Sequence, residues 1–203
     1  FVGDNNTYIG YQCGLVNTTG FENVGIGTQC LNSNITGFQN VALGNRTLFR
    51  NVFGISNVAI GHEALYYSTY SLINVAIGRQ AMYNTTTGSN NTALGFQSSF
   101  SNITGSSNIS MGYQSLYFNT AGYNNTSIGY QSLYYNTASN NTAIGYQCSY
   151  WNSTGQFNTA IGYKCLMGET NVYTQTNANV AIGYQCGLFV GNQAQNNVLI
   201  GYE

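Results

Sequence analysis

Charged residues are nearly missing from this chain of 203 residues. Lysine and arginine number four and aspartate and glutamate five, so the net charge is −1 and charged residues make up 4% of the chain. An ordinary soluble domain carries about 25%. Nucleic-acid binding and polybasic membrane anchoring both need clustered Lys and Arg. We therefore expect no nucleic-acid partner and no anchor of that kind.

Proline is absent, and no apolar run reaches the roughly 18 residues of a membrane span. We therefore expect no membrane insertion. Aromatic residues make up 14% of the chain and hydrophobic residues 43%, which argues against a disordered chain. Most of the polarity comes from 30 Asn, 21 Thr and 17 Ser. The absence of proline is typical of a chain in which each segment donates backbone hydrogen bonds to its neighbours.

Groups for catalysis are scarce as well. The acidic residues are scattered, with no pair of carboxylates at one level of the repeat described below, and His62 is the only histidine. The Gly25-Ile26-Gly27 segment belongs to the repeat and lacks the following helix of a phosphate-binding loop. We expect no catalytic residues, no cofactor and no metal site, and hence a protein that is not an enzyme.

The chain is an internal repeat from end to end. Asn57-Val58-Ala59-Ile60-Gly61 recurs in twelve variants, which are spaced by 17 residues except for one shorter and two longer units after Gly129. The largest insertion predicts an extra loop at 168–178. The units close at Gly10, Gly27, Gly44, Gly61, Gly78, Gly95, Gly112, Gly129, Gly145, Gly162, Gly183 and Gly201.

Each unit is too short to bury its apolar side alone, whereas stacked units bury it because Ile meets Ile and Ala meets Ala. The segment before the closing glycine has the alternation of a short strand. We expect a weaker second strand after it, for example at Gln114 to Phe118. Residues 1–203 are thus predicted to form a single all-β domain, a parallel β-solenoid or β-roll with one coil per repeat. With strands about 4.8 Å apart, twelve coils give a rod roughly 55 Å long.

All five cysteines occupy one slot, three residues after the closing glycine, where other units carry Ala, Ser or Thr. One interpretation is a buried column of small residues, with Cys as a small hydrophobe. The other is disulfide bonds between neighbouring coils, Cys13 with Cys30 and Cys148 with Cys165. Cys186 would then be free or would pair with another chain.

An aromatic residue follows the closing glycine in seven successive units, which predicts a stripe along the rod surface. The rings could lock coil on coil by stacking, or could present a contact surface for a sugar or another protomer. In the next slot, Arg46 and Glu63 lie one coil apart, and we expect a solvated ion pair of small energy. The stripe comprises Phe96, Tyr113, Tyr130, Tyr146, Tyr163, Tyr184 and Tyr202.

The asparagine that begins each unit predicts a ladder of side-chain amides hydrogen-bonded along the stack. Twelve Asn-x-Ser/Thr sequons occur in the chain. Those at Asn108 and Asn125 fall on the ladder and should be poor glycan acceptors. The best candidates, expected in exposed turns, are Asn17, Asn34, Asn84, Asn102 and Asn152.

The Asn-Thr-Ala-Ile-Gly-Tyr-Gln unit at 141–147 and the related Asn158 to Tyr163 segment resemble the repeats of phage and viral tail-fibre proteins. They also resemble the head repeats of trimeric autotransporter adhesins. The resemblance spans nearly the whole chain. It implies a left-handed parallel β-roll, often trimeric, that is displayed outside a cell or on a virion.

The leading functional hypothesis is a structural subunit of an extracellular fibre. Both ends read as ordinary coils, which predicts a homo-oligomer, either a head-to-tail filament or a trimer. An alternative is an adhesin that binds a receptor such as a glycan through the aromatic stripe or the 168–178 loop. A remote alternative is ice binding, although the threonines at 92, 126, 142 and 159 form only one interrupted column.

Overall fold

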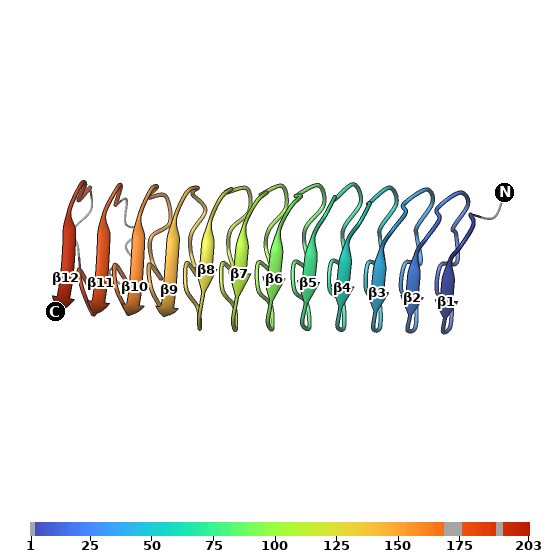
Figure 1. Ribbon diagram of the computed structural model, residues 1–203, viewed down its shortest axis with the longest axis horizontal. Helices are drawn as coiled ribbons and strands as arrows, with labels where there is room; N and C mark the ends of the chain where they lie inside the picture. The colour runs from blue at the N-terminus through green and yellow to red at the C-terminus, as the bar shows by residue number, and fades with distance from the viewer. Residues whose placement is uncertain (1–2, 169–175, 190–192) are drawn as a thin grey trace.

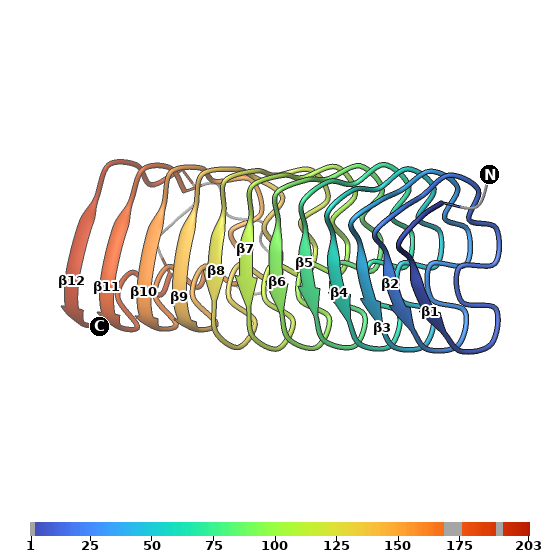
Figure 2. The same ribbon diagram turned by 45° about the vertical axis from the view of Figure 1, so that its right-hand side comes forward.

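The computed structural model describes residues 3–168, 176–189 and 193–203, and it is a β-solenoid. Twelve parallel strands form one sheet in sequence order, and the two termini lie at opposite ends of the rod (Figures 1 and 2). No helix is present in the described ranges, so none there could cross a membrane. The predicted fold class is therefore confirmed. Most of the loop predicted at 168–178 lies outside the described residues.

The strands are short, and in the first eight coils each strand ends at the residue before the closing glycine. Those of the last four coils extend two residues further than the others. They are β1 (Thr7–Ile9), β2 (Val24–Ile26), β3 (Val41–Leu43), β4 (Val58–Ile60), β5 (Val75–Ile77), β6 (Thr92–Leu94), β7 (Ile109–Met111), β8 (Thr126–Ile128), β9 (Thr142–Tyr146), β10 (Thr159–Tyr163), β11 (Val180–Tyr184) and β12 (Val198–Tyr202).

The register between strands keeps equivalent residues side by side. Val58 pairs with Val75, Ala59 with Ala76 and Ile60 with Ile77, and the same alignment continues along the sheet. The closing glycine follows with a positive φ, as at Gly112 with φ 130°, where an added Cβ would lie 2.4 Å from the carbonyl oxygen of Gly129. Only glycine fits this turn, because both its backbone angle and the neighbouring coil exclude a side chain.

The second segment of each coil is not a strand, contrary to expectation. Gln114 and Leu116 both have left-handed backbone angles, with φ 50° and 54°, so the chain turns instead of extending. It still pairs with its neighbours, since the Leu116 amide donates to the Ser132 carbonyl at 3.0 Å and the Gln114 amide to the Phe96 carbonyl at 2.9 Å. Hydrogen bonding from coil to coil therefore does not require β conformation here.

Columns of apolar side chains fill the interior, and the slot that holds the cysteines is one of them. The central residue of most strands is alanine and points inward, as at Ala59, which is fully buried. Four residues after the closing glycine comes a second column, mostly leucine, as at Leu65. The isoleucines, by contrast, point outward: Ile26 is 42% exposed. The expectation that stacked Ile builds the core is thus wrong, because Ile and Ala alternate along a strand and face opposite sides.

The asparagine ladder is buried and continuous, as predicted. Asn40 donates from its backbone amide to the Asn23 Oδ1 at 3.0 Å and from its Nδ2 to the Gly54 carbonyl at 2.8 Å. The same pattern recurs in the following coils, for example from Asn108 to Asn91. Each amide thus satisfies backbone groups of a turn that would otherwise be buried without partners.

Candidate functional surface

Three columns of side chains point outward from the sheet, and we call them together the outer face. They are the first and third residues of each three-residue strand and the residue after the closing glycine, since alternate positions of an extended chain face the same side. The first column holds Val, Thr or Ile, and the second holds Ile, Leu or Met. Leu94 is 46% exposed and Ile182 36%, and most other apolar side chains of these two columns are partly exposed.

The aromatic stripe forms the third column over the C-terminal half and is stacked as predicted. Ring centroids of Phe96 and Tyr113 lie 5.2 Å apart, and those of Tyr184 and Tyr202 lie 4.9 Å apart, with all the rings in between paired likewise. Tyr130 is 42% exposed. Stacking covers the ring faces, so the stripe presents ring edges and hydroxyl groups to solvent. A sugar that stacks on a ring face finds none open between these neighbours.

The N-terminal coils continue the third column with other residues. Arg79 precedes the stripe, and its guanidinium carbon lies 5.9 Å from the centroid of the Phe96 ring. His62 stands one coil earlier and is exposed. The three columns hold no charged residue from Phe96 onward, but the Nζ of Lys164, from the next slot, lies 5.5 Å from the centroid of the Tyr163 ring.

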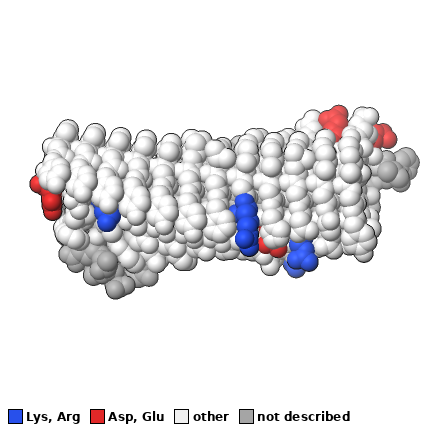
Figure 3. All heavy atoms as spheres, turned by 90° about the horizontal axis from the view of Figure 1, so that it is seen from below, with Lys and Arg blue, Asp and Glu red and all other residues white. Residues whose placement is uncertain are grey.

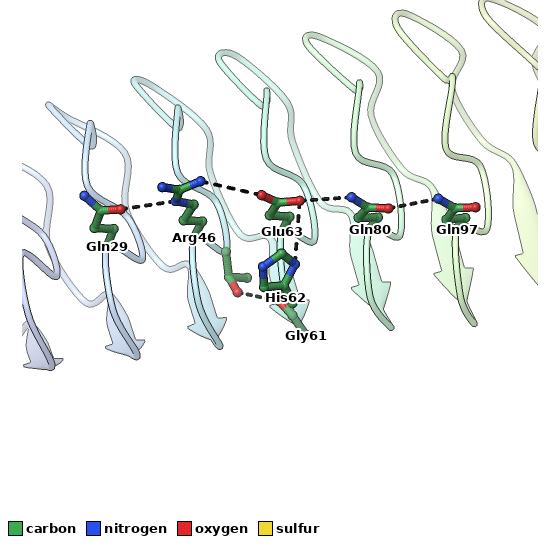
Figure 4. A network of polar contacts seen from close by, with 8 residues as sticks. Gln29, Arg46, Gly61, His62, Glu63, Gln80 and Gln97 are labelled. Atoms are coloured by element: carbon green, nitrogen blue, oxygen red, sulfur yellow. Dashed lines mark hydrogen bonds and ion pairs between the residues drawn. The ribbon is translucent and has the colours of Figure 1, made fainter.

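A ladder of polar side chains borders the outer face, mostly glutamines (Figure 4). Gln97 donates to Gln80 at 2.9 Å, and Gln80 donates to the Glu63 Oε2 at 3.0 Å. Arg46 lies 3.9 Å from the other Glu63 oxygen and donates from its Nε to Gln29 at 3.2 Å. The predicted Arg46–Glu63 pair is thus present. Its length and the exposure of the arginine keep its contribution below about 1 kcal/mol.

Charged groups are few on the surface seen in Figure 3. Red patches occur at both ends, a blue patch lies near the left-hand end, and both colours occur at one place along the rod; the remaining described surface in this view is uncharged. Over most of its length the rod therefore lacks charge repulsion that would keep neighbouring rods apart.

All five cysteines are thiols in this structure. The Sγ atoms of Cys13 and Cys30 are in contact at 2.7 Å, and the hydrogen bond from Cys30 lowers the pKa of Cys13. Cys148 and Cys165 instead donate to carbonyl oxygens of the following coils, those of Gly162 and Gly183. The interpretation as a column of small residues fits this packing, since four of the five are buried. Disulfide formation within either pair stays a prediction.

Burial sets the chemistry of the C-terminal thiols. Burial raises the pKa of Cys148 to about 12, well above the ordinary value near 9. Cys186 is 5% exposed and also donates to a carbonyl oxygen of the next coil. Because Cys186 is buried, we expect it to stay a thiol in the folded rod and not to form a disulfide bond with another chain.

Three of the five predicted glycan acceptors are buried, which corrects the expectation that all lie in exposed turns. Asn34, Asn102 and Asn152 belong to a second asparagine column in the interior. Asn34 and Asn102 each donate at 3.0 Å to a glycine carbonyl three residues later, so they form the inside of the turn. Asn17 and Asn84 are partly exposed and stay candidates. Exposed sequon asparagines that the sequence reasoning passed over are Asn5, Asn45, Asn90 and Asn124.

A second aromatic row was missed. It lies five residues after the closing glycine, and the same spacing that revealed the stripe would have revealed it. Neighbouring rings stack at centroid distances between 5.0 and 5.2 Å. Its members are Phe49, Tyr66, Tyr83, Phe100, Tyr117, Tyr134 and Tyr150.

The comparisons with known proteins give no relative. No protein-family model matches the chain, and neither does any curated protein or solved structure.

Proposed function

We propose that the chain is a structural subunit of an extracellular fibre, and that rods associate with one another through the outer face. The observation that carries the proposal is the continuous column of Ile, Leu and Met beside the column of Val, Thr and Ile, both at least partly exposed along the sheet and continuous with the aromatic stripe. Contiguous apolar surfaces of more than a few hundred Å² mark interaction sites in soluble proteins. The extracellular location is supported by the resemblance of the repeat unit to fibre repeats.

The size of the outer face supports a stable contact. Four residues of extended chain cover about 13 Å, and twelve strands at 4.8 Å spacing cover roughly 55 Å, so the face measures about 700 Å². A standard interface buries about 800 Å² on each partner. Two such faces in contact therefore approach the area of a specific, lasting interface.

The composition of the outer face favours a second copy as the partner. The first two columns repeat at one spacing along the whole sheet, and the aromatic stripe does so along its C-terminal half, so an identical rod offers ridges of matching pitch. The three columns contain no carboxylate, so they give no complementary site to a basic partner. The neighbouring column of an ice-binding array would need threonine, whereas here it holds Ile, Leu and Met.

Charge placed on the outer face tests the proposal. The double variant Ile77→Lys and Ile128→Lys puts two ammonium groups among the outward apolar side chains without touching the interior. Wild-type protein is expected to form oligomers or bundles in analytical ultracentrifugation and electron microscopy, and the double variant to be monomeric with an unchanged circular dichroism spectrum. Thr104→Lys, on an exposed turn, is the control and should assemble like wild type. Wild-type protein that stays monomeric at high concentration would contradict the proposal.

A further inference from the structure

A third aromatic column, six residues after the closing glycine, is interrupted in the middle of the rod. Phe118, Tyr135 and Trp151 stack in successive coils at 5.0 and 4.4 Å. Tyr67 stands in the same column further toward the N-terminus. Between Tyr67 and Phe118, two coils carry Asn84 and Ser101 in place of rings. The column is therefore a stack of rings with two members missing.

The interruption leaves a groove of about 360 Å³ on the surface of the rod. Its lining combines one ring, one aliphatic side chain and four small polar side chains: Tyr67, Asn84, Thr86, Ser101, Ile103 and Thr120. Three coil spacings separate Tyr67 from Phe118, or roughly 14 Å, and the rings themselves occupy only the ends of that span. The groove is thus within the range of small-molecule sites, near its lower limit.

The Tyr67 ring lines the groove and is packed by neighbouring side chains. Arg50, in the preceding coil of the column, lies 5.1 Å from its centroid, and Tyr66 and Tyr83 contact it edge to face. Among the described residues no ring stacks on the side of Tyr67 where Asn84 stands. This ring face is therefore open, unlike the faces of the rings paired within the aromatic stripe.

Three polar side chains of the groove have unused hydrogen-bond donors and acceptors. The side chains of Asn84, Ser101 and Thr120 make no hydrogen bond to another described residue, although all three lie at the surface of the groove. They offer amide and hydroxyl groups, which both donate and accept. No charged side chain lines the groove. An anionic ligand, such as a nucleotide, would lack a cation to pair with its phosphates.

We propose that this groove binds a neutral saccharide of one or two pyranose units. The C–H face of a pyranose packs on an open aromatic ring, whose face carries the negative part of its quadrupole. The hydroxyl groups of the sugar pair with the uncharged donors and acceptors of Asn84, Ser101 and Thr120. The proposal is independent of self-association, because a monomeric rod has the same groove.

Filling the missing ring position tests the site. Asn84→Tyr completes the column beside Tyr67, and the fold accepts it because Tyr67 and Tyr135 occupy the same slot in other coils. The matched control is Asn45→Tyr, the same substitution in the column that carries the aromatic stripe elsewhere. Protein made in bacteria, free of N-linked glycan at Asn84, is titrated with cellobiose, lactose and di-N-acetylchitobiose by ligand-observed NMR and calorimetry.

At least one of these disaccharides is expected to bind saturably to wild type and to the control. Asn84→Tyr should weaken that binding by at least about tenfold, and Tyr67→Ala should weaken it as well. Absence of binding by all three sugars overturns the proposal, as does binding that survives Asn84→Tyr. If Asn84→Tyr instead changes the oligomeric state, the groove is a contact between copies and the saccharide assignment is wrong.

Discussion

The coils around β2 to β6 and those around β7 and β8 have the same backbone but different interiors. In the first region the inward columns are alanine and leucine, as at Ala76 and Leu65. In the second, Ser110 and Ser127 replace alanine and are equally buried. The strand register continues unbroken from Ala93 to Ser110. The strand register is therefore unchanged where serine replaces alanine in the interior column.

The comparison shows which feature the fold requires at these positions. Ser99 donates to Ser110 at 2.8 Å, and Ser127 lies 2.6 Å from the Ser132 hydroxyl, so most of these groups find partners inside the coil. A buried hydroxyl costs little when it is hydrogen-bonded. These interior positions thus require a small side chain but not an apolar one. The asparagine ladders and backbone hydrogen bonds hold the coils together in both regions.

Removing one rung of the ladder in each region should give the largest effect. Asn74→Ala and Asn108→Ala each delete an acceptor for the next coil and a donor to a glycine carbonyl, those of Gly88 and Gly122. Each variant should lose about 3 kcal/mol of unfolding free energy, because several buried backbone and amide groups lose their partners. Urea denaturation measures the loss.

The two losses should agree within about 0.5 kcal/mol. The exposed Asn45, whose side chain makes no hydrogen bond to a described residue, serves as control through Asn45→Ala, which should be nearly neutral. A much larger loss at Asn108 would mean that the serine-lined region depends on its ladder more than the alanine-lined region does.

A smaller effect is expected from two serines of the same slot in neighbouring coils. Ser98 and Ser115 are both fully buried, but Ser98 donates to the Gly95 carbonyl at 3.2 Å, whereas the Ser115 hydroxyl has no partner among the described residues. Ser115→Ala should therefore stabilise the protein by about 1 kcal/mol. Ser98→Ala should destabilise it by a similar amount. Thermal unfolding distinguishes the two, and equal shifts of one sign would refute the assignment of partners.

The repeat period and the small residues make most of the fold predictable from the sequence. A spacing of 17 residues with a closing glycine and a leading asparagine is sufficient to predict one parallel strand per coil, and the ring stack and the Arg46–Glu63 pair follow from the same register. The direction of side chains is harder to predict. Alternation alone does not say whether Ile or Ala faces the core, and only the narrow interior, which admits alanine, decides it.

Local departures from the repeat were beyond prediction because they depend on neighbours in other coils. Tyr8 occupies the alanine position of the first coil, and its ring lies where a side chain on Gly14 would be, since an added Cβ there would approach the ring to 2.5 Å. The leucine of that slot is thus replaced by glycine to admit the tyrosine. The groove beside Tyr67 arises similarly, from Asn84 and Ser101, and becomes visible only once the coils are stacked.

Both regions should also share a loss of stability at alkaline pH. Burial raises the pKa of Tyr83, in the alanine-lined region, to about 12, with help from the charge of Glu63. Burial likewise raises the pKa of Tyr134, beside the serine-lined coils, to about 12, with help from Tyr150. The unfolded chain loses these protons near pH 10 and the folded chain only near pH 12, so the unfolded state binds fewer protons in between. Stability is therefore complete below about pH 10 and falls as the pH rises toward 12. Thermal melts across this range, with Tyr83→Phe and Tyr134→Phe beside wild type, should show a shallower decline in each variant; an unchanged decline in both would place the alkaline sensitivity in other groups, such as the buried thiol of Cys148.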